Sequence, residues 1–311
     1  MKDVKDIVGV IPAMVSCFDA DGNFDEQAQR ELTRFLLRKK VDGLYLAGST
    51  GESFLMTEQA RKQVVETVSD EVKGQIPMIV HVGDIGTGKS IEFARHAQRC
   101  GAAAVSSVPP FYFKFTPDEI VSYYEDVSAS VDLPMIVYNI ALAGLVDFNT
   151  IKRLSKIPTV QGIKYTATTH NEILRIKDEI SPDFSVYSGA DEMALSGFAF
   201  GADGIIGSFY NVIPELFQII WHATRENDLP RARDAQNKAN VIIYYVLKNH
   251  FFDCIKAMLN WAGISAGTVL SPFYKLNKED ETRIKREMKA LIIKYNITEC
   301  EVLNRIKELT D

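Results

Sequence analysis

The sequence has little of what marks several large protein classes. Its four cysteines lie far apart and form no CxxC pair, which indicates free thiols in a reducing compartment instead of a disulfide framework. The five histidines are scattered, without the HExxH spacing of a zinc site. No apolar run reaches membrane-spanning length, and the polar first residues lack the apolar core of a signal peptide. A cytoplasmic protein without a metal site is therefore expected.

Excess positive charge is also missing. The 311 residues carry 35 Lys and Arg against 41 Asp and Glu, a net charge of -6, with no basic stripe and no low-complexity segment. Proteins that hold nucleic acid through its phosphates need the opposite balance, so neither a nucleic-acid partner nor a membrane partner is expected. With 46% hydrophobic residues, the chain has the composition of an ordinary globular protein.

What the sequence does contain is a regular alternation of strand and helix patterns. Amphipathic segments separate eight short β-rich runs, and several begin with a capping residue such as Thr57 or Thr116. Eight such units within about 215 residues predict a (β/α)8 barrel, with a doubly wound open sheet as the alternative. The expected strands are Val10–Phe18, Gly43–Ala47, Met78–Val82, Ala102–Val108, Met135–Tyr138, Val160–Lys164, Phe184–Tyr187 and Gly204–Ile206.

The strand pattern stops after the eighth run. The segments that follow predict helices only, over Glu215–Asn227, Arg231–Leu247, Phe252–Ala262 and Glu279–Leu309. We therefore expect a catalytic barrel domain over residues 1–215 and a C-terminal helical domain over residues 216–311.

Polar residues gather where the predicted strands end. In a β/α barrel, the active site forms from these C-terminal strand ends and the loops that follow them. Lys164 is the most informative of them, because a buried ammonium is costly and burial favours the free amine, which can attack a ketone to form a Schiff base. A lysine that reaches solvent at the strand end, or a structural ion pair, is the alternative. The other residues on this rim are Gly48–Glu52, Tyr138, Gly189, Asp191, Glu192, Gly207 and Ser208.

Each neighbour of Lys164 on this rim has two interpretations. Gly48–Glu52, with two hydroxyls and two glycines, suits a carboxylate ligand or simply caps a helix. Tyr138 can shuttle a proton or pack in the core. Asp191 and Glu192 can grip the hydroxyls of a polyol or begin a helix.

A rival motif lies at Gly83–Ser90. Its sequence, GDIGTGKS, fits the phosphate-loop pattern GxxxxGK[ST] between a strand and a helix, with Lys89 as the phosphate-binding lysine. It predicts a nucleotide-binding protein. Its place in the third of eight units, and the lack of a second strand ending in a magnesium-binding aspartate, favour an ordinary glycine-rich turn.

Taken together, these residues resemble the N-acetylneuraminate lyase and dihydrodipicolinate synthase family of pyruvate-dependent class I aldolases, from about residue 9 to residue 272. The resemblance implies a barrel with a helical domain, no cofactor, and usually a homotetramer. The motifs that carry it are GSTGE at 48–52, Tyr138-Asn139, Gly162-Ile163-Lys164 and Gly207-Ser208.

The resemblance also implies roles for individual residues. Lys164 would form the Schiff base with the 2-oxo acid, and Tyr138 would be the proton shuttle. Ser49 and Thr50 would hold the pyruvate carboxylate, while Tyr112 matches an aromatic residue near a neighbouring subunit's site.

Within the family, the sequence is similar to the lyase branch. The synthase branch has an arginine shortly after the strand-five tyrosine, whereas Asn139–Gly144 contains none. The Asp-Glu pair after strand seven and the run Gly207–Asn211 follow the lyase pattern. The sugar-binding residues that this similarity implies are Thr166, Gly189, Asp191, Glu192 and Ser208, with Phe252 packed nearby.

Two positions depart from the lyase pattern. The loop after Tyr138 lacks the usual proline and is one residue shorter, and Phe209 replaces the usual threonine. The expected reaction is reversible cleavage of N-acetylneuraminate to N-acetylmannosamine and pyruvate. The alternatives are another 2-keto-3-deoxy sugar acid, a synthase-like condensation, or a non-catalytic sugar-binding protein, the last of which the intact Lys164–Tyr138 pair disfavours.

Overall fold

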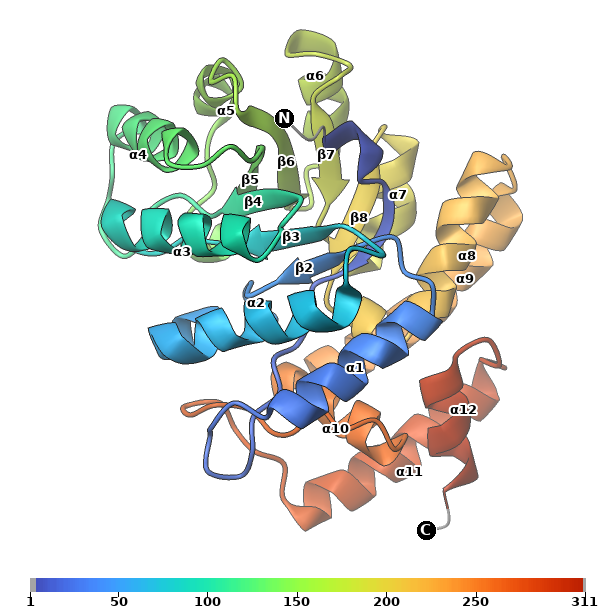
Figure 1. Ribbon diagram of the computed structural model, residues 1–311. Helices are drawn as coiled ribbons and strands as arrows, with labels where there is room; N and C mark the ends of the chain where they lie inside the picture. Colours follow the sequence, from blue (N-terminus) through green and yellow to red (C-terminus); the bar gives the residue numbers. More distant parts are fainter. Residues whose placement is uncertain (1–3, 310–311) are drawn as a thin grey trace.

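A ring of parallel strands forms the centre of the molecule, and helices cover it from outside (Figure 1). The computed structural model describes residues 4–309. Neighbouring strands pair in parallel in the order β1-β8-β7-β6-β5-β4-β3-β2. The strands are β1 (Gly9–Pro12), β2 (Leu44–Leu46), β3 (Met78–His81), β4 (Ala104–Ser107), β5 (Met135–Ile140), β6 (Val160–Thr166), β7 (Ser185–Ser188) and β8 (Gly204–Gly207).

Backbone contacts between the first two strands close the ring. The N–H of Met14, just after β1, donates to the Tyr45 carbonyl of β2 at 2.9 Å, beside a parallel bridge between Ala13 and Tyr45. This closure confirms the predicted (β/α)8 barrel and excludes the open sheet. The predicted first strand was too long, because β1 ends at Pro12, the last ring contacts are those of Ala13 and Met14, and Phe18 pairs instead with Phe24 and Thr268.

Helices follow each strand, as the alternation predicts. Thr57 caps α2 by accepting from the Ala60 N–H, and Thr116 forms a capping box with Glu119 at the start of α4, which confirms both expected caps. The barrel helices are α1 (Glu26–Arg38), α2 (Glu58–Val72), α3 (Thr87–Arg99), α4 (Pro117–Ala129), α5 (Phe148–Leu154), α6 (Asn171–Glu179), α7 (Ala194–Ala199) and α8 (Pro214–Arg225).

The chain after the barrel is helical and gathers at one side of it (orange to red in Figure 1). The stretch Glu279–Leu309 holds two helices, separated by a break at which Asn296 adopts a left-handed backbone with φ 49°. Among residues 4–309, no helix combines the length and apolar character needed to cross a bilayer. The division at residues 215 and 216 stays a prediction. The helices are α9 (Leu229–Leu247), α10 (Phe251–Trp261), α11 (Lys278–Lys294) and α12 (Glu301–Glu308).

The pleat of the strands sorts side chains into an inner and an outer core. Along β5, Ile136 and Tyr138 belong to the apolar cluster inside the ring, while Met135 and Val137 belong to the larger cluster that also takes in the helices. Along β6, Ile163 belongs to the outer cluster. The next residue, Lys164, therefore points into the barrel.

Candidate active site

Lys164 lies inside the barrel between two tyrosines. It pairs in register with Tyr138 on β5 and Tyr187 on β7, and its residue surface is 3% exposed. Its Nζ atom is 4.2 Å from the ring centroid of Tyr138 and 4.3 Å from that of Tyr45. Among the described residues, no carboxylate comes within 4.0 Å of this nitrogen. The amine is thus buried against aromatic faces without a salt bridge.

This environment favours the uncharged amine. Burial lowers the pKa of Lys164 to about 7, and the negative charge of Asp191 opposes part of that shift. A substantial share of the side chain is therefore a free amine at neutral pH. A free amine of low pKa is what nucleophilic attack on a ketone requires.

Tyr138 stays protonated at neutral pH. Burial raises the pKa of its phenol to about 12, and the adjacent hydroxyls of Ser49 and Thr166 offset part of the rise. A protonated phenol acts as an acid, or as a relay that passes its own proton on while it accepts another. The Tyr138 ring lies against the Lys164 amine, so a protonated phenol and a buried amine share one site.

The turn after β2 offers donors to an anion. Within residues 4–309, the backbone N–H groups of Ser49 and Thr50 make no hydrogen bond to the protein. The Thr50 hydroxyl lies 2.6 Å from that of Ser208, which joins this turn to the one after β8. Free N–H groups and hydroxyls in one turn form a concave site for a carboxylate.

Two glycines make room for the side chains of the site. A Cβ atom on Gly189 would overlap the Thr166 hydroxyl, and one on Gly207 would overlap the carboxylate of Asp191. These glycines therefore permit the close approach of the turns after β6, β7 and β8.

The Asp191 side chain lies at this site and accepts a hydrogen bond from the backbone of the protein. Its Oδ2 atom accepts from the Phe209 N–H at 2.8 Å, and burial raises the pKa of this carboxyl to about 7. Glu192, the next residue, is half-buried. From α9, Gln236 donates to the Asp191 carbonyl and Asn240 to the Glu192 carbonyl, each at 3.1 Å. These two amides fix the turn, and nothing in their sequence context marked them in advance.

The structure places most of the predicted site residues together. Lys164, Tyr138, Ser49 and Thr166 meet inside the barrel, as described above. Thr50 and Ser208 are linked by their hydroxyls, and Gly189, Asp191 and Glu192 follow on the neighbouring turn. Tyr112 is not among them, because it is 84% exposed on the loop after β4 with φ 79°.

An apolar cavity of about 270 Å³ opens beside Ser49. Its wall includes Ile140 at the end of β5, Leu142 in the segment that follows, and Phe252 of α10. Phe209, the residue that departs from the lyase pattern, is instead buried, with its ring 5.7 Å from that of Phe251. Its bulk therefore packs against α10 rather than lining this cavity.

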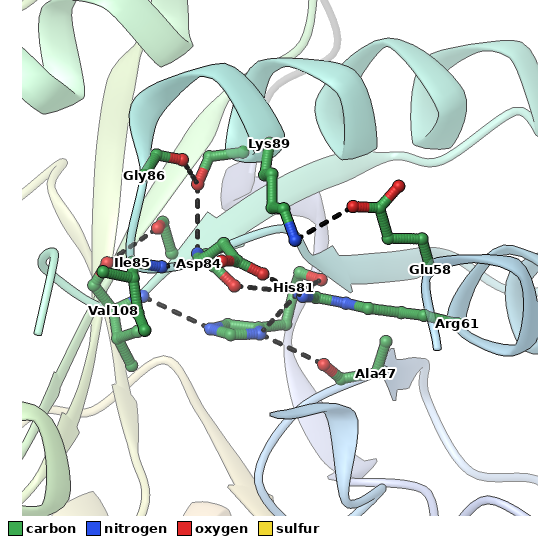
Figure 2. A network of polar contacts seen from close by, with 12 residues as sticks. Ala47, Glu58, Arg61, His81, Asp84, Ile85, Gly86, Lys89 and Val108 are labelled. Carbon is green, nitrogen blue, oxygen red and sulfur yellow. Dashed lines mark hydrogen bonds and ion pairs between the residues drawn. The ribbon is translucent and has the colours of Figure 1, made fainter. Parts of the chain in front are cut away.

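The protein's own side chains contact the start of the turn Gly83–Ser90 (Figure 2). The guanidinium of Arg61 donates to the Gly83 carbonyl at 3.0 Å, and the Ser90 hydroxyl accepts from the Asp84 N–H at 3.0 Å. Lys89 pairs with Glu58 at 3.0 Å on the surface. None of the motif's glycines adopts a positive φ. This geometry lacks the backbone cradle of a phosphate loop and does not support the nucleotide-binding alternative.

Arg61 and His81 form a second buried layer that sequence reasoning missed (Figure 2). The Nδ1 atom of His81 lies 3.1 Å from the Ala47 carbonyl, and its Nε2 atom accepts from the Val108 N–H at 3.3 Å. Burial holds the pKa of His81 well below its usual value, so the ring is neutral and donates to Ala47. Ala47, with φ 53°, leads into the anion-binding turn.

Fold and site together define a β/α-barrel protein with a buried lysine of lowered pKa near the carboxyl end of β6. The chain belongs to the Dihydrodipicolinate synthetase family, whose model matches residues 6–291. N-acetylneuraminate lyase of Citrobacter koseri is 38% identical over 263 residues, which are 84% of this chain and 88% of that relative.

Solved structures agree with this assignment. A Clostridium difficile protein in complex with mannosamine has a TM-score of 0.89 and 32% identity, covering 93% of this chain and 99% of that one. The sialic acid aldolase of Ruminococcus gnavus has a TM-score of 0.89 and 32% identity, covering 94% of this chain and 98% of its own. A catalytic lysine mutant of that aldolase has a TM-score of 0.90 and 31% identity, covering 95% and 99%.

Proposed function

We propose that this protein is a class I aldolase that cleaves N-acetylneuraminate reversibly to N-acetylmannosamine and pyruvate. The observation that carries the proposal is Lys164, a buried amine without a salt bridge that faces Tyr138 beside an anion-binding turn. The lyase and aldolase relatives support the choice of substrate.

The reaction begins when the Lys164 amine adds to the C2 ketone of the open-chain sugar acid. Loss of water gives a protonated imine, which withdraws electrons from C3. The pKa of about 7 keeps the amine available before attack. Ser49 and Thr50 orient the C1 carboxylate, so that the ketone lies over the amine.

Bond cleavage follows from loss of the C4 hydroxyl proton. Tyr138 accepts this proton while its own proton moves to a neighbouring acceptor, because the free phenolate is costly at a pKa of about 12. The C3–C4 electrons enter the imine and give an enamine, and N-acetylmannosamine leaves as the aldehyde. Protonation of the enamine at C3 and hydrolysis of the imine then release pyruvate and free Lys164.

The sugar portion is bound by the turns after β6, β7 and β8. We assign Thr166 and Ser208 as hydroxyl ligands, because both are half-buried at the site. Glu192 accepts from sugar hydroxyls, and Gly189 contributes its backbone. Asp191 orders the turn after β8 through Phe209, in addition to any contact with the sugar.

Two measurements test this function. Borohydride reduction with pyruvate should attach a three-carbon adduct to Lys164, identified by mass spectrometry of peptides, and a coupled assay should detect pyruvate released from N-acetylneuraminate. An unlabelled Lys164 in folded protein would contradict the proposal. If pyruvate labels Lys164 but N-acetylneuraminate is not cleaved, a panel of 2-keto-3-deoxy sugar acids identifies the substrate.

We further propose that the protein is a cytoplasmic homotetramer. Its four cysteines are free thiols, which suits a reducing compartment. On the loop after β4, Tyr112 is 84% and Phe113 64% exposed, and an apolar pair of this kind suits a subunit contact. In the proposed assembly Tyr112 reaches toward a neighbouring subunit's site, and sedimentation of native protein and a Tyr112→Ser variant tests that contact.

A further inference from the structure

A second buried lysine lies beneath the anion-binding turn. Lys256, on α10, is 1% exposed, and its Nζ atom pairs with Glu52 at 2.5 Å. The same nitrogen donates to the Thr268 carbonyl at 2.7 Å. The Glu52 side chain is fully buried, and its other oxygen accepts from the Leu270 N–H at 2.7 Å. The C-terminal part of the chain thus encloses this carboxylate.

Glu52 is the last residue of the turn that carries Ser49 and Thr50. Its backbone adopts the left-handed conformation with φ 60°, which is costly for a residue with a side chain. Its N–H donates to the Ser49 carbonyl at 3.0 Å. A fixed Glu52 carboxylate therefore holds the end of the turn, and through it the orientation of Ser49.

Such an ion pair is poorly explained by stability alone. Moving two charges out of water costs about as much as their attraction returns, so a buried pair is weak evidence of a stabilising role. What the pair does provide is a single position for the carboxylate, set by Lys256 and the Leu270 N–H. Both contacts come from residues more than 200 positions away in the sequence.

We propose that Lys256, acting through Glu52, positions the turn that binds the carboxylate of the 2-oxo acid. This inference rests on the proposed function, because it assigns the turn to that carboxylate. It makes the C-terminal helices part of the substrate site, although they supply no reacting group. Lys256 and Glu52 are positioning residues, since neither touches the reacting atoms.

The test measures the pyruvate concentration that half-saturates borohydride trapping at Lys164. Glu52→Gln is the mildest change, and Glu52→Gln combined with Lys256→Met removes both charges without leaving one unpaired. We expect each variant to raise the half-saturating concentration about tenfold, with full labelling at saturation. For methyl pyruvate, an ester without the free carboxylate, the half-saturating concentration should change by less than about twofold.

A matched control comes from the C-terminal helices themselves. Lys238 on α9 pairs with Glu299 at 2.6 Å, away from the turn, so Lys238→Met should leave the half-saturating pyruvate concentration unchanged. The inference would be overturned if the half-saturating concentrations of pyruvate and methyl pyruvate rose equally. It would also be overturned if the half-saturating pyruvate concentration were unchanged in folded Glu52→Gln protein. Absence of any adduct in the native protein would instead overturn the proposed function, and the inference with it.

Discussion

Lys164 and Lys256 are both buried lysines, yet they serve opposite purposes. Burial lowers the pKa of each amine, and each lies over an aromatic ring, Lys164 at 4.2 Å from Tyr138 and Lys256 at 4.6 Å from Phe18. The difference is the carboxylate of Glu52, which pairs with Lys256, whereas no carboxylate within residues 4–309 forms a salt bridge with Lys164. Burial and aromatic contact are therefore shared by the two lysines, and the salt bridge is what distinguishes Lys256 from the proposed nucleophile.

Asp191 is the carboxylate whose charge influences the pKa of Lys164. The carboxylate of Asp191 opposes the lowering of the Lys164 pKa. Burial raises its own pKa to about 7, and one of its oxygens accepts a hydrogen bond from the Phe209 N–H. Unlike Glu52, Asp191 forms no salt bridge within the described residues. Burial lowers the pKa of both amines, and at Lys256 the carboxylate of Glu52 opposes that shift from within salt-bridge distance.

The largest loss of activity should come from removing the amine of Lys164. Lys164→Ala should lower pyruvate release by about 10⁴-fold or more, because no other group can form the imine. Peptide mapping after borohydride treatment should show no adduct elsewhere, Lys256 included. Labelling of Lys256 in this variant would show that the two lysines are not distinguished by the Glu52 pair.

A smaller loss of cleavage activity should follow from removing the Tyr138 hydroxyl, which belongs to the ring that lies against the Lys164 amine. Tyr138→Phe should lower kcat for cleavage by about 10² to 10³-fold, the usual contribution of a positioned proton donor. Trapping of pyruvate at Lys164 should persist, because the amine and the carboxylate turn are unchanged. Loss of trapping together with cleavage, in folded protein, would mean that Tyr138 acts on the amine instead of the substrate.

The pH dependence should reveal the lowered pKa of Lys164. The amine reacts in its uncharged form, so the rate of adduct formation should rise about tenfold per pH unit below 7 and level off above that value. Stopped-time borohydride quenching across pH 5 to 9 measures this profile. A rate that keeps rising up to pH 9 would indicate a lysine with an ordinary pKa and would contradict the lowered pKa of Lys164.

The smallest effect concerns a third lysine, the one in the phosphate-loop pattern. Lys89 is exposed and paired with Glu58, so Lys89→Ala should change pyruvate release by less than about twofold. Equilibrium dialysis should find no binding of ATP to native protein or variant. Saturable ATP binding that is lost in Lys89→Ala would restore the nucleotide-binding alternative.

The barrel and the nucleophile follow from local sequence patterns. Alternating strand and helix signals predict the (β/α)8 fold, and a lysine at the end of a predicted apolar strand predicts Lys164 as a residue of the site. These features depend on residues close in the chain. The first strand was overestimated, because the pattern continues past Pro12 although the backbone turns toward Phe24 and Thr268.

The supporting contacts could not be predicted in the same way. Lys256 meets Glu52 only after the C-terminal helices dock, and Gln236 reaches Asp191 from α9 for the same reason. Similarly, the pattern at Gly83–Ser90 matched a phosphate loop, but the contact of Arg61 with the Gly83 carbonyl depends on how α2 packs. Contacts between segments that are distant in the chain leave no local sequence pattern from which they could be predicted.

Gly189 and Gly207 have a consequence for anyone who redesigns the substrate range of this protein. Libraries that randomise a binding pocket usually treat each lining position as an independent variable. Here any side chain at either glycine would occupy the space of Thr166 or Asp191, so changes at these two positions would have to be made together with changes at their neighbours. Diversity is better placed at Leu142, whose side chain is 79% exposed at the mouth of the apolar cavity.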